Sequence, residues 1–185
     1  MSKCRDILII QTGGTIDKVY PQLPESCRLN FGEPAVVNIL ARNAPCFPYN
    51  VQTVCTKDSY EITEEDREDI LRYVVEADQE LVLITHGMTT MCETAKYLVH
   101  AGVGQGSKYG PGVGQKIVVL TGASKPECMK DSDADFNIGL ALGFLQGSSN
   151  PGVFVAVEGS VVPGAHVVRT KEGKFVDDRD LLKRF

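Results

Sequence analysis

The order of the apolar segments is the feature that most constrains the fold of this chain. Short runs rich in Ile and Val alternate with longer segments whose apolar residues recur at helical spacing. The runs are DILIIQ at residues 6–11, NVQTVC at 50–55, ELVLIT at 80–85, KIVVLT at 116–121 and GVFVAV at 152–157. Strands that alternate with helices in this way form a parallel sheet covered on both faces. We therefore predict a three-layer α/β fold with a mainly parallel sheet.

Three of the intervening segments carry helix signals. One helix is expected from about Thr63, because acidic residues open it and an apolar stripe follows on one face. A second is expected near residues 34–42, with Pro34 in its first turn. A third is expected to start at Ser132 as the N-cap and to bury an apolar stripe. Packing alone explains these three patterns.

Length and composition indicate one domain, residues 1–185, with a single core. The 185 residues are 43% hydrophobic and 23% charged. The formal charge is −5, and no basic run with interleaved aromatic residues indicates nucleic-acid binding. No signal-peptide core and no apolar segment of membrane-spanning length is present, so we expect a soluble, cytoplasmic protein without membrane contact. We expect no C-terminal domain.

Neither a metal nor a cofactor is expected. The six cysteines are scattered without a CxxC pair or a histidine at zinc-ligand spacing, so we expect free thiols. The glycine-rich insertion at residues 101–115 follows a helix and precedes a strand, whereas phosphate-binding glycine loops run from strand to helix. We interpret it as a flexible surface loop, with ligand binding as the alternative.

Small and polar residues follow the first four strands of the predicted sheet. The segments are 12–17, 56–59, 86–90 and 122–126. Since the carboxyl ends of parallel strands meet at one crevice, these loops should lie together. In the first of them, TGGTI places two hydroxyls around a Gly-Gly turn whose N–H groups could face an oxyanion. Thr15 is then a candidate nucleophile; alternatively, both threonines bond the backbone of the turn itself.

Four blocks occur together in one order: TGGTI, ITHGMTTMCETA, VVLTGASKP and SDADFNIG. Over residues 6–171 they resemble the N-terminal domain of the bacterial-type L-asparaginases, particularly the short single-domain members. The resemblance implies the fold of that domain and amide hydrolysis through a threonine acyl-enzyme, with no metal. It places the nucleophile at Thr15, beside Gly14 of the substrate-binding turn. It places the tyrosine of the mobile flap at Tyr20, the carboxylate-binding serine at Thr56 and the amide-bearing position at Lys57.

Three positions depart from the pattern of the family. Where the family has HGTDT, this chain has HGMTT, so that Met88 replaces the second essential threonine and Thr89 the aspartate that pairs with the substrate ammonium. The catalytic lysine falls on Arg169, with Lys171 two residues away. A thioether cannot deliver a proton, a neutral hydroxyl cannot replace a carboxylate, and Arg stays protonated. We expect no second domain after Phe185 that would supply a carboxylate to a partner subunit, as full-length members of the family have.

Two main functional hypotheses follow. The first is an asparaginase-like or glutaminase-like amidohydrolase with altered or lost asparaginase activity, in which Tyr20 or Lys57, paired with its neighbour Asp58, assists Thr15. The second is a non-catalytic module that binds a small ligand. Either would take an amino-acid-like or dicarboxylate ligand, and the resemblance implies a homodimer or homotetramer.

A third, thiol-based site is an alternative at the block 84–95. Cys92 lies in the first turn of a helix, where the helix dipole lowers a thiol pKa, although packing equally explains a cysteine there. In the same block, His86 is interpreted as a structural histidine that anchors the turn. Thr90 and Glu93 form the T-x-x-E pattern of a capping box.

Overall fold

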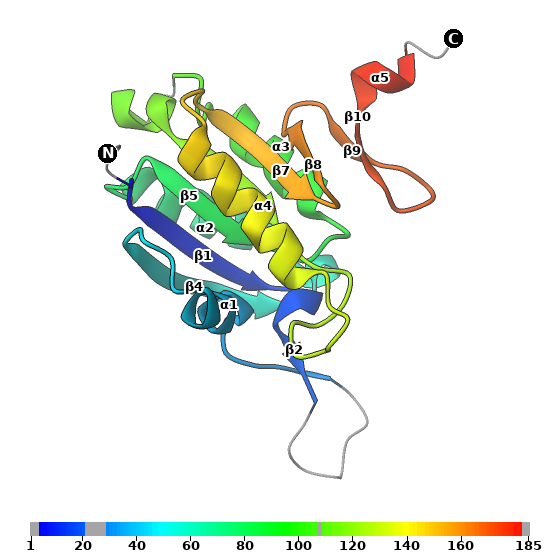
Figure 1. Ribbon diagram of the computed structural model, residues 1–185. Coiled ribbons are helices and arrows are strands. Elements are labelled where there is room, and N and C mark those ends of the chain that lie inside the picture. Colours follow the sequence, from blue (N-terminus) through cyan, green and yellow to red (C-terminus); the bar gives the residue numbers. More distant parts are fainter. Residues whose placement is uncertain (1–3, 21–28, 107–108, 183–185) are drawn as a thin grey trace.

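The computed structural model describes residues 4–20, 29–106 and 109–182. Its centre is a six-stranded sheet in the order β4-β1-β5-β6-β7-β8 (Figure 1). The strands are β1 (Ile7–Gly13), β4 (Tyr49–Lys57), β5 (Leu81–Thr85), β6 (Ile117–Thr121), β7 (Gly152–Val157) and β8 (Ser160–Pro163). All neighbours pair in parallel except β7 and β8, which are antiparallel. The predicted mainly parallel α/β fold is therefore confirmed.

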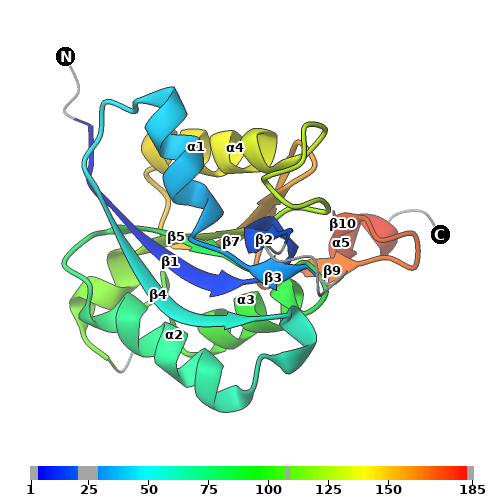
Figure 2. The same ribbon diagram turned by 90° about the horizontal axis from the view of Figure 1, so that it is seen from below.

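Helices cover both faces of the sheet, as Figure 2 shows. On one side lie α1 (Ala35–Asn43) and α4 (Ala134–Gly147), and on the other α2 (Glu64–Glu76) and α3 (Met91–His100). Successive side chains of a strand point to opposite faces. In β1, Ile7 and Ile9 accordingly pack in the cluster with α1 and α4, whereas Leu8 and Ile10 pack in the cluster with α2 and α3. Burial of both faces accounts for the continuous apolar runs of the sequence.

Helix α4 begins at Ala134, and its N-cap is Asp133 instead of the predicted Ser132. The Asp133 carboxylate accepts hydrogen bonds from the backbone N–H groups of Ser124 and Lys125 at 3.0 Å. The Ser132 hydroxyl accepts from the Ala134 N–H at 3.1 Å. The hydrogen bonds between Asp133 and the loop after β6 thus determine where this helix begins. The helix from Thr63 begins as predicted, with a reciprocal Thr63–Asp66 capping box.

Short elements flank the sheet. Strand β2 (Lys18–Val19) pairs with β3 (Asn30–Phe31), and 3-10 turns span Thr15–Asp17, Ser59–Glu61 and Pro111–Gln115. After β8, β9 (Val167–Arg169) and β10 (Phe175–Asp177) form a hairpin that leads into α5 (Asp178–Leu182) and projects from the body of the protein (Figure 1). Val167 and Phe175 anchor this hairpin in the core. The sequence patterns did not predict β8, β9 or β10.

The glycine-rich segment 101–115 is packed at both ends. Val103 and Val113 are buried, and the Gly104 N–H donates to the Val113 carbonyl oxygen at 3.0 Å. A Cβ on Gly104 would lie 2.3 Å from the Gly152 Cα, so the segment touches the start of β7. The interpretation as a surface loop is therefore wrong for these two ends. Residues 107–108 lie outside the described part of the chain.

The five cysteines within the described ranges are free thiols, and Cys27 lies outside them. None of the helices in the described ranges is long and apolar enough to cross a membrane.

Candidate functional site

The loops that follow β1, β4, β5 and β6 meet backbone to backbone at the carboxyl end of the sheet. A Cβ on Gly14 would lie 2.5 Å from the Gly87 Cα, and a Cβ on Gly87 would lie 2.6 Å from the Ser59 Cβ. A Cβ on Gly122 would lie 2.2 Å from the His86 carbonyl oxygen. No side chain fits at these distances, so the glycines allow the four loops to converge as predicted.

A bulge in β1 decides which residues of the loop after β4 face the crevice. The pairing of β1 with β4 shifts between Gln11 and Gly13, and Gly13 has a φ of 96°. The Gly14 N–H then donates to the Lys57 carbonyl oxygen at 2.9 Å. Strand β4 therefore continues through Lys57, and the prediction that Thr56 and Lys57 lie in the loop is wrong. The crevice receives residues 58–60 instead.

These loops enclose a pocket of about 390 Å³. Every loop of the crevice contributes to its wall, and β9 adds one side chain from the C-terminal hairpin. The lining residues are Thr15, Lys18, Asp58, Ser59, Tyr60, Gly87, Met88, Thr89, Ala123, Ser124 and Arg169. The sequence patterns singled out Thr15, Met88, Thr89 and Arg169 among them. The pocket offers hydroxyls, one thioether and both signs of charge.

The hydroxyl-bearing residues of TGGTI have different surroundings. Thr12 is buried, and its hydroxyl donates to the Thr85 carbonyl oxygen at 2.9 Å, which ties β1 to β5. Thr15 is half-buried and lines the pocket. The N–H of Gly14 is already bonded to the Lys57 carbonyl oxygen, so it is not an oxyanion donor as the sequence suggested. Thr12 is structural, and Thr15 alone of the pair faces the crevice.

Asp17, at the end of the same turn, connects this turn to helix α1. Its carboxylate accepts a hydrogen bond from the N–H of Ala35, the first residue of α1, at 2.7 Å. Burial raises the pKa of Asp17 to about 6. A carboxylate at a helix N-terminus bonds an N–H that has no partner within the helix. The turn that carries Thr15 is thereby fixed to α1.

Met88 separates the pocket from the core. Its side chain is only 8% exposed and belongs to the apolar cluster under α2 and α3. The Ser124 hydroxyl donates to the Met88 Sδ at 3.6 Å. Thr89, the next residue, is half-buried in the pocket wall. This part of the wall can exclude water but cannot exchange a proton at neutral pH.

The charged groups near the crevice form two ion pairs that the sequence did not indicate. Lys18 Nζ lies 2.7 Å from Asp58 Oδ1 within the pocket wall. Lys57 Nζ lies 2.7 Å from Asp66 Oδ2, outside the wall. The hydrogen bond with Asp66 raises the pKa of Lys57, which keeps it protonated. The predicted Lys57–Asp58 pair is therefore wrong, and Lys57 is not a base for Thr15.

His86 is a buried anchor of the loop after β5. Its Nδ1 lies 2.8 Å from the Gly87 carbonyl oxygen, and its Nε2 lies 2.9 Å from the Thr94 hydroxyl. A carbonyl can only accept, so Nδ1 carries the proton and Nε2 accepts from Thr94. Burial lowers the pKa of His86 to about 4, which keeps the ring neutral. This agrees with a structural histidine.

Replacement of His86 by Gln should change how stability depends on pH. The pKa of His86 is about 4 in the folded state, below its ordinary value of 6.5, so the unfolded state binds more protons between these values. Acidification across this interval should therefore remove about 3 kcal/mol more stability from the protein than from His86→Gln. Urea unfolding of both proteins from pH 7 to pH 4 measures the difference. A difference that is constant with pH would contradict the assignment.

Comparison with known proteins identifies the fold. A family model described as "Asparaginase, N-terminal" matches residues 6–176. This chain belongs to the asparaginase family. No curated protein matches it in sequence. Because the family model covers most of the chain, the resemblance of the four sequence blocks is confirmed.

Solved asparaginase structures have the same fold. The thermostable L-asparaginase from Thermococcus kodakarensis superposes with a TM-score of 0.72 at 23% identity, over 93% of this chain and 51% of that one. A probable cytoplasmic L-asparaginase from Campylobacter jejuni gives 0.72 at 22% identity, over 94% and 51%. L-asparaginase I from Vibrio cholerae gives 0.74 at 18% identity, over 94% and 50%. The chain thus spans about half the length of these structures.

The residues assigned through the asparaginase family fall into two groups. Thr15, Met88, Thr89 and Arg169 line the pocket together, with Gly14 packed against Gly87 directly behind it. The second group does not line the pocket: Tyr20 is 66% exposed, Thr56 is exposed at the end of β4, and Lys57 is paired with Asp66. At the C-terminal end, Arg169 reaches the wall and Lys171 does not.

Two further interpretations of the block 84–95 are decided by contacts. The Thr90 hydroxyl donates to the Ser59 carbonyl oxygen at 2.6 Å and caps no helix N–H, while Glu93 pairs with Arg67 at 3.1 Å. The predicted capping box is therefore wrong.

Burial raises the pKa of Cys92, whose side chain packs against the core, so the half-buried thiol is not activated.

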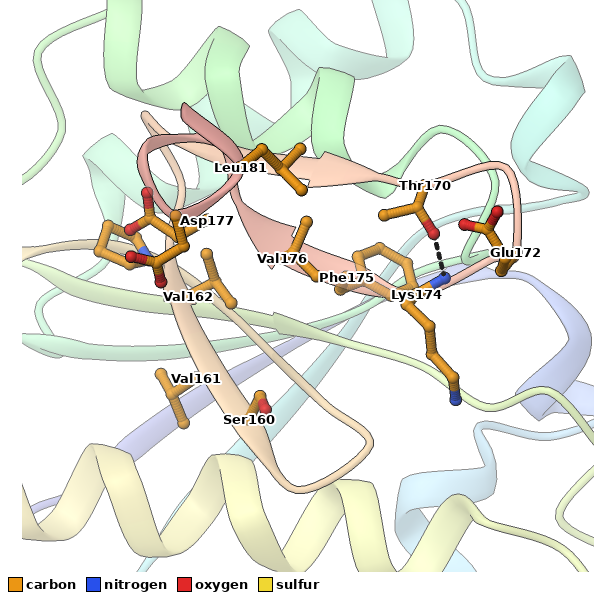
Figure 3. Close-up of a pocket in the computed structure, with 12 residues that line it drawn as sticks. Ser160, Val161, Val162, Thr170, Glu172, Lys174, Phe175, Val176, Asp177 and Leu181 are labelled. Carbon is orange, nitrogen blue, oxygen red and sulfur yellow. Dashed lines mark hydrogen bonds between the residues drawn. The ribbon is translucent and has the colours of Figure 1, made fainter. Parts of the chain in front are cut away.

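A larger hollow of about 680 Å³ lies between β8 and the C-terminal hairpin (Figure 3). Apolar side chains of β8, β10 and α5, among them Val162, Val176 and Leu181, face it, with Glu172 and Lys174 at its rim. None of the residues that line it belongs to the loops after β1, β4, β5 and β6. The candidate functional site is therefore the smaller pocket, where the loops after β1, β4, β5 and β6 converge.

Among the described residues, one group could hold a metal ion: His166, Asp177 and Asp178, whose ligand atoms lie within 4.8 Å of one another. Ion pairs already explain this arrangement. His166 Nδ1 lies 3.3 Å from Asp178 Oδ1, and Asp177 accepts two hydrogen bonds from the Arg179 guanidinium. The group does not line the pocket.

Proposed function

We propose that this chain is an asparaginase-like domain that binds a small amino-acid-like or dicarboxylate ligand beside Thr15, with altered or lost asparaginase activity. The observation that carries the proposal is the set of residues that line the pocket together with Thr15. Thr15 shares one pocket with a thioether at Met88 and a neutral hydroxyl at Thr89. The pocket persists, and the groups that would handle protons in the family are replaced.

The ionisable groups of the wall support the loss of turnover. A threonine hydroxyl is a poor nucleophile without a neighbouring base. Lys18 is paired with Asp58, and a guanidinium such as that of Arg169 cannot act as a base. No hydrogen bond within the described ranges joins the Thr15 hydroxyl to any of them. These contacts favour a non-catalytic binding module over an amidohydrolase that has only changed its substrate. Assembly as a homodimer or homotetramer stays a prediction of the family resemblance.

A thermal-shift screen tests whether the pocket binds a ligand. Asn, Asp, Gln, Glu, succinate and glutarate are the compounds to try. A ligand at one hundred times its Kd that binds only the folded state adds about 2.7 kcal/mol, which raises the Tm of a domain of this size by roughly 5 to 10 °C. We expect at least one of these compounds to give such a shift.

A pair of tryptophan variants controls this screen. Ser124 is exposed at the rim of the pocket, and Ser149 is exposed far from its wall. Ser124→Trp should fill the pocket and abolish the ligand-induced shift, whereas Ser149→Trp should retain it. Failure of every compound to stabilise the protein would refute the proposed function, and an equal shift in Ser124→Trp would place the binding elsewhere.

A further inference from the structure

The balance of charge in the pocket indicates which small ligands it can hold. Lys18, Asp58 and Arg169 are the residues of its wall that are charged at neutral pH. The first two neutralise each other across 2.7 Å, and Asp58 Oδ2 accepts a second contact from Lys18 at 2.9 Å. The pocket therefore keeps one uncompensated positive charge, that of Arg169, and no uncompensated carboxylate.

The hairpin β9–β10 holds Arg169 in place. Its Nε donates to the Gly173 carbonyl oxygen at 3.2 Å, and its guanidinium carbon lies 5.7 Å from the centre of the Phe175 ring. A Cβ on Gly173 would lie 3.4 Å from Nη2, so the turn passes close to the guanidinium. Within the described ranges no carboxylate pairs with Arg169, and no hydrogen bond engages its Nη groups. The side chain is partly ordered and still has donors for a ligand.

The wall of the pocket offers no unpaired carboxylate to the α-ammonium group of an amino-acid ligand. The side chains on the opposite loops that could face it are Thr89, Ser59 and Ser124, all neutral, and Met88, which is apolar. An ammonium would have to displace Lys18 from Asp58 or enter without a charged partner. Both routes cost binding free energy, because a charge removed from water needs a partner of opposite sign.

We propose that the pocket selects small carboxylates without an α-ammonium group, with Arg169 binding a carboxylate of the ligand. This inference rests on the proposed function, because it specifies the ligand class of that same pocket. Arg169, which the family resemblance places at the position of a catalytic lysine, serves here as an anion anchor. The preferred ligand is then a dicarboxylate or its monoamide, and the free amino acid is disfavoured.

Calorimetric titration with two probes tests the selection. Succinate and L-aspartate differ only in the ammonium group. We expect succinate to bind at least tenfold more tightly than L-aspartate. Arg169→Gln should weaken succinate binding by about ten- to a hundredfold, the usual effect of losing a hydrogen bond between charged groups. Arg179→Gln is the matched control, because Arg179 is bonded to Asp177 outside the pocket; it should leave both affinities unchanged.

A gain-of-function variant provides a second, independent measurement. Thr89→Asp adds a carboxylate to the wall, so it should strengthen L-aspartate binding and weaken succinate binding, which reverses the preference. If Arg169→Gln does not fold, Arg169→Lys is the second variant. It keeps the positive charge but loses the planar guanidinium that can donate two hydrogen bonds to a carboxylate, so it should weaken succinate binding severalfold. Equal or tighter binding of L-aspartate to the unaltered protein, or no effect of Arg169 variants, would overturn the inference while leaving the proposed function standing. Binding of no probe and of no compound in the screen would overturn both.

Discussion

The purified protein should release ammonia from L-asparagine no faster than its Thr15→Ala variant. Thr15 lines a pocket in which Met88, Thr89 and Arg169 stand where the family resemblance places a threonine, an aspartate and a lysine. Loss of one member of a catalytic unit typically lowers turnover by about four to six orders of magnitude, and the remaining members then contribute little. The measurement is ammonia release from asparagine and from glutamine, with both proteins at high concentration.

A triple variant with the residue types of the family tests whether the three replacements cause this inactivity. Met88→Thr, Thr89→Asp and Arg169→Lys together restore the residue types of the family at three positions of the wall. If their replacement accounts for the inactivity, ammonia release by the triple variant should exceed that of the unaltered protein and should depend on Thr15. A rate for the unaltered protein well above that of Thr15→Ala would instead show that another group activates the hydroxyl.

The parts of the structure that the sequence predicted are those fixed by local patterns. Apolar runs predicted β1, β5, β6 and β7, because strands buried on both faces carry apolar residues without interruption. The edge strand β4 is partly exposed, and its run at residues 50–55 mixes polar and apolar residues. The rule that loops meet at the carboxyl ends of such strands placed Thr15, Met88 and Thr89 in one pocket. These predictions needed only periodicity and the topology of a parallel sheet.

The parts that the sequence did not predict depend on contacts between distant segments. The bulge at Gly13 lengthens β4 by pairing with Lys57, and so brings Asp58 instead of Thr56 to the crevice. Thr90 matches the capping pattern, yet its hydroxyl bonds the carbonyl of Ser59, 31 residues earlier, because the loops pack against each other. A local motif competes with tertiary partners, and here the tertiary partner prevails.

Substitution of Gly14 by alanine should strongly destabilise the protein. Gly14 has φ 87° and ψ −178°, a region that is open essentially to glycine alone, and a side chain there costs about 1 to 3 kcal/mol. In addition, a Cβ would lie 2.5 Å from the backbone N and Cα of Gly87, and overpacking of this kind costs about 1 to 3 kcal/mol. Gly14→Ala should therefore lower the free energy of unfolding by roughly 2 to 6 kcal/mol, as measured by urea denaturation.

Gly139 provides the matched control, because the same substitution there should have the opposite sign. It is exposed within α4, and its Cβ would have open space around it. Alanine is the better helix former by about 1 kcal/mol, so Gly139→Ala should raise the free energy of unfolding by that amount. Equal effects of the two substitutions would contradict both the backbone strain at Gly14 and its close approach to Gly87. If the loops after β1 and β5 touch as the structure describes, the alanine at position 14 must also push Gly87 away, and ligand-induced stabilisation should weaken even in the fraction that folds.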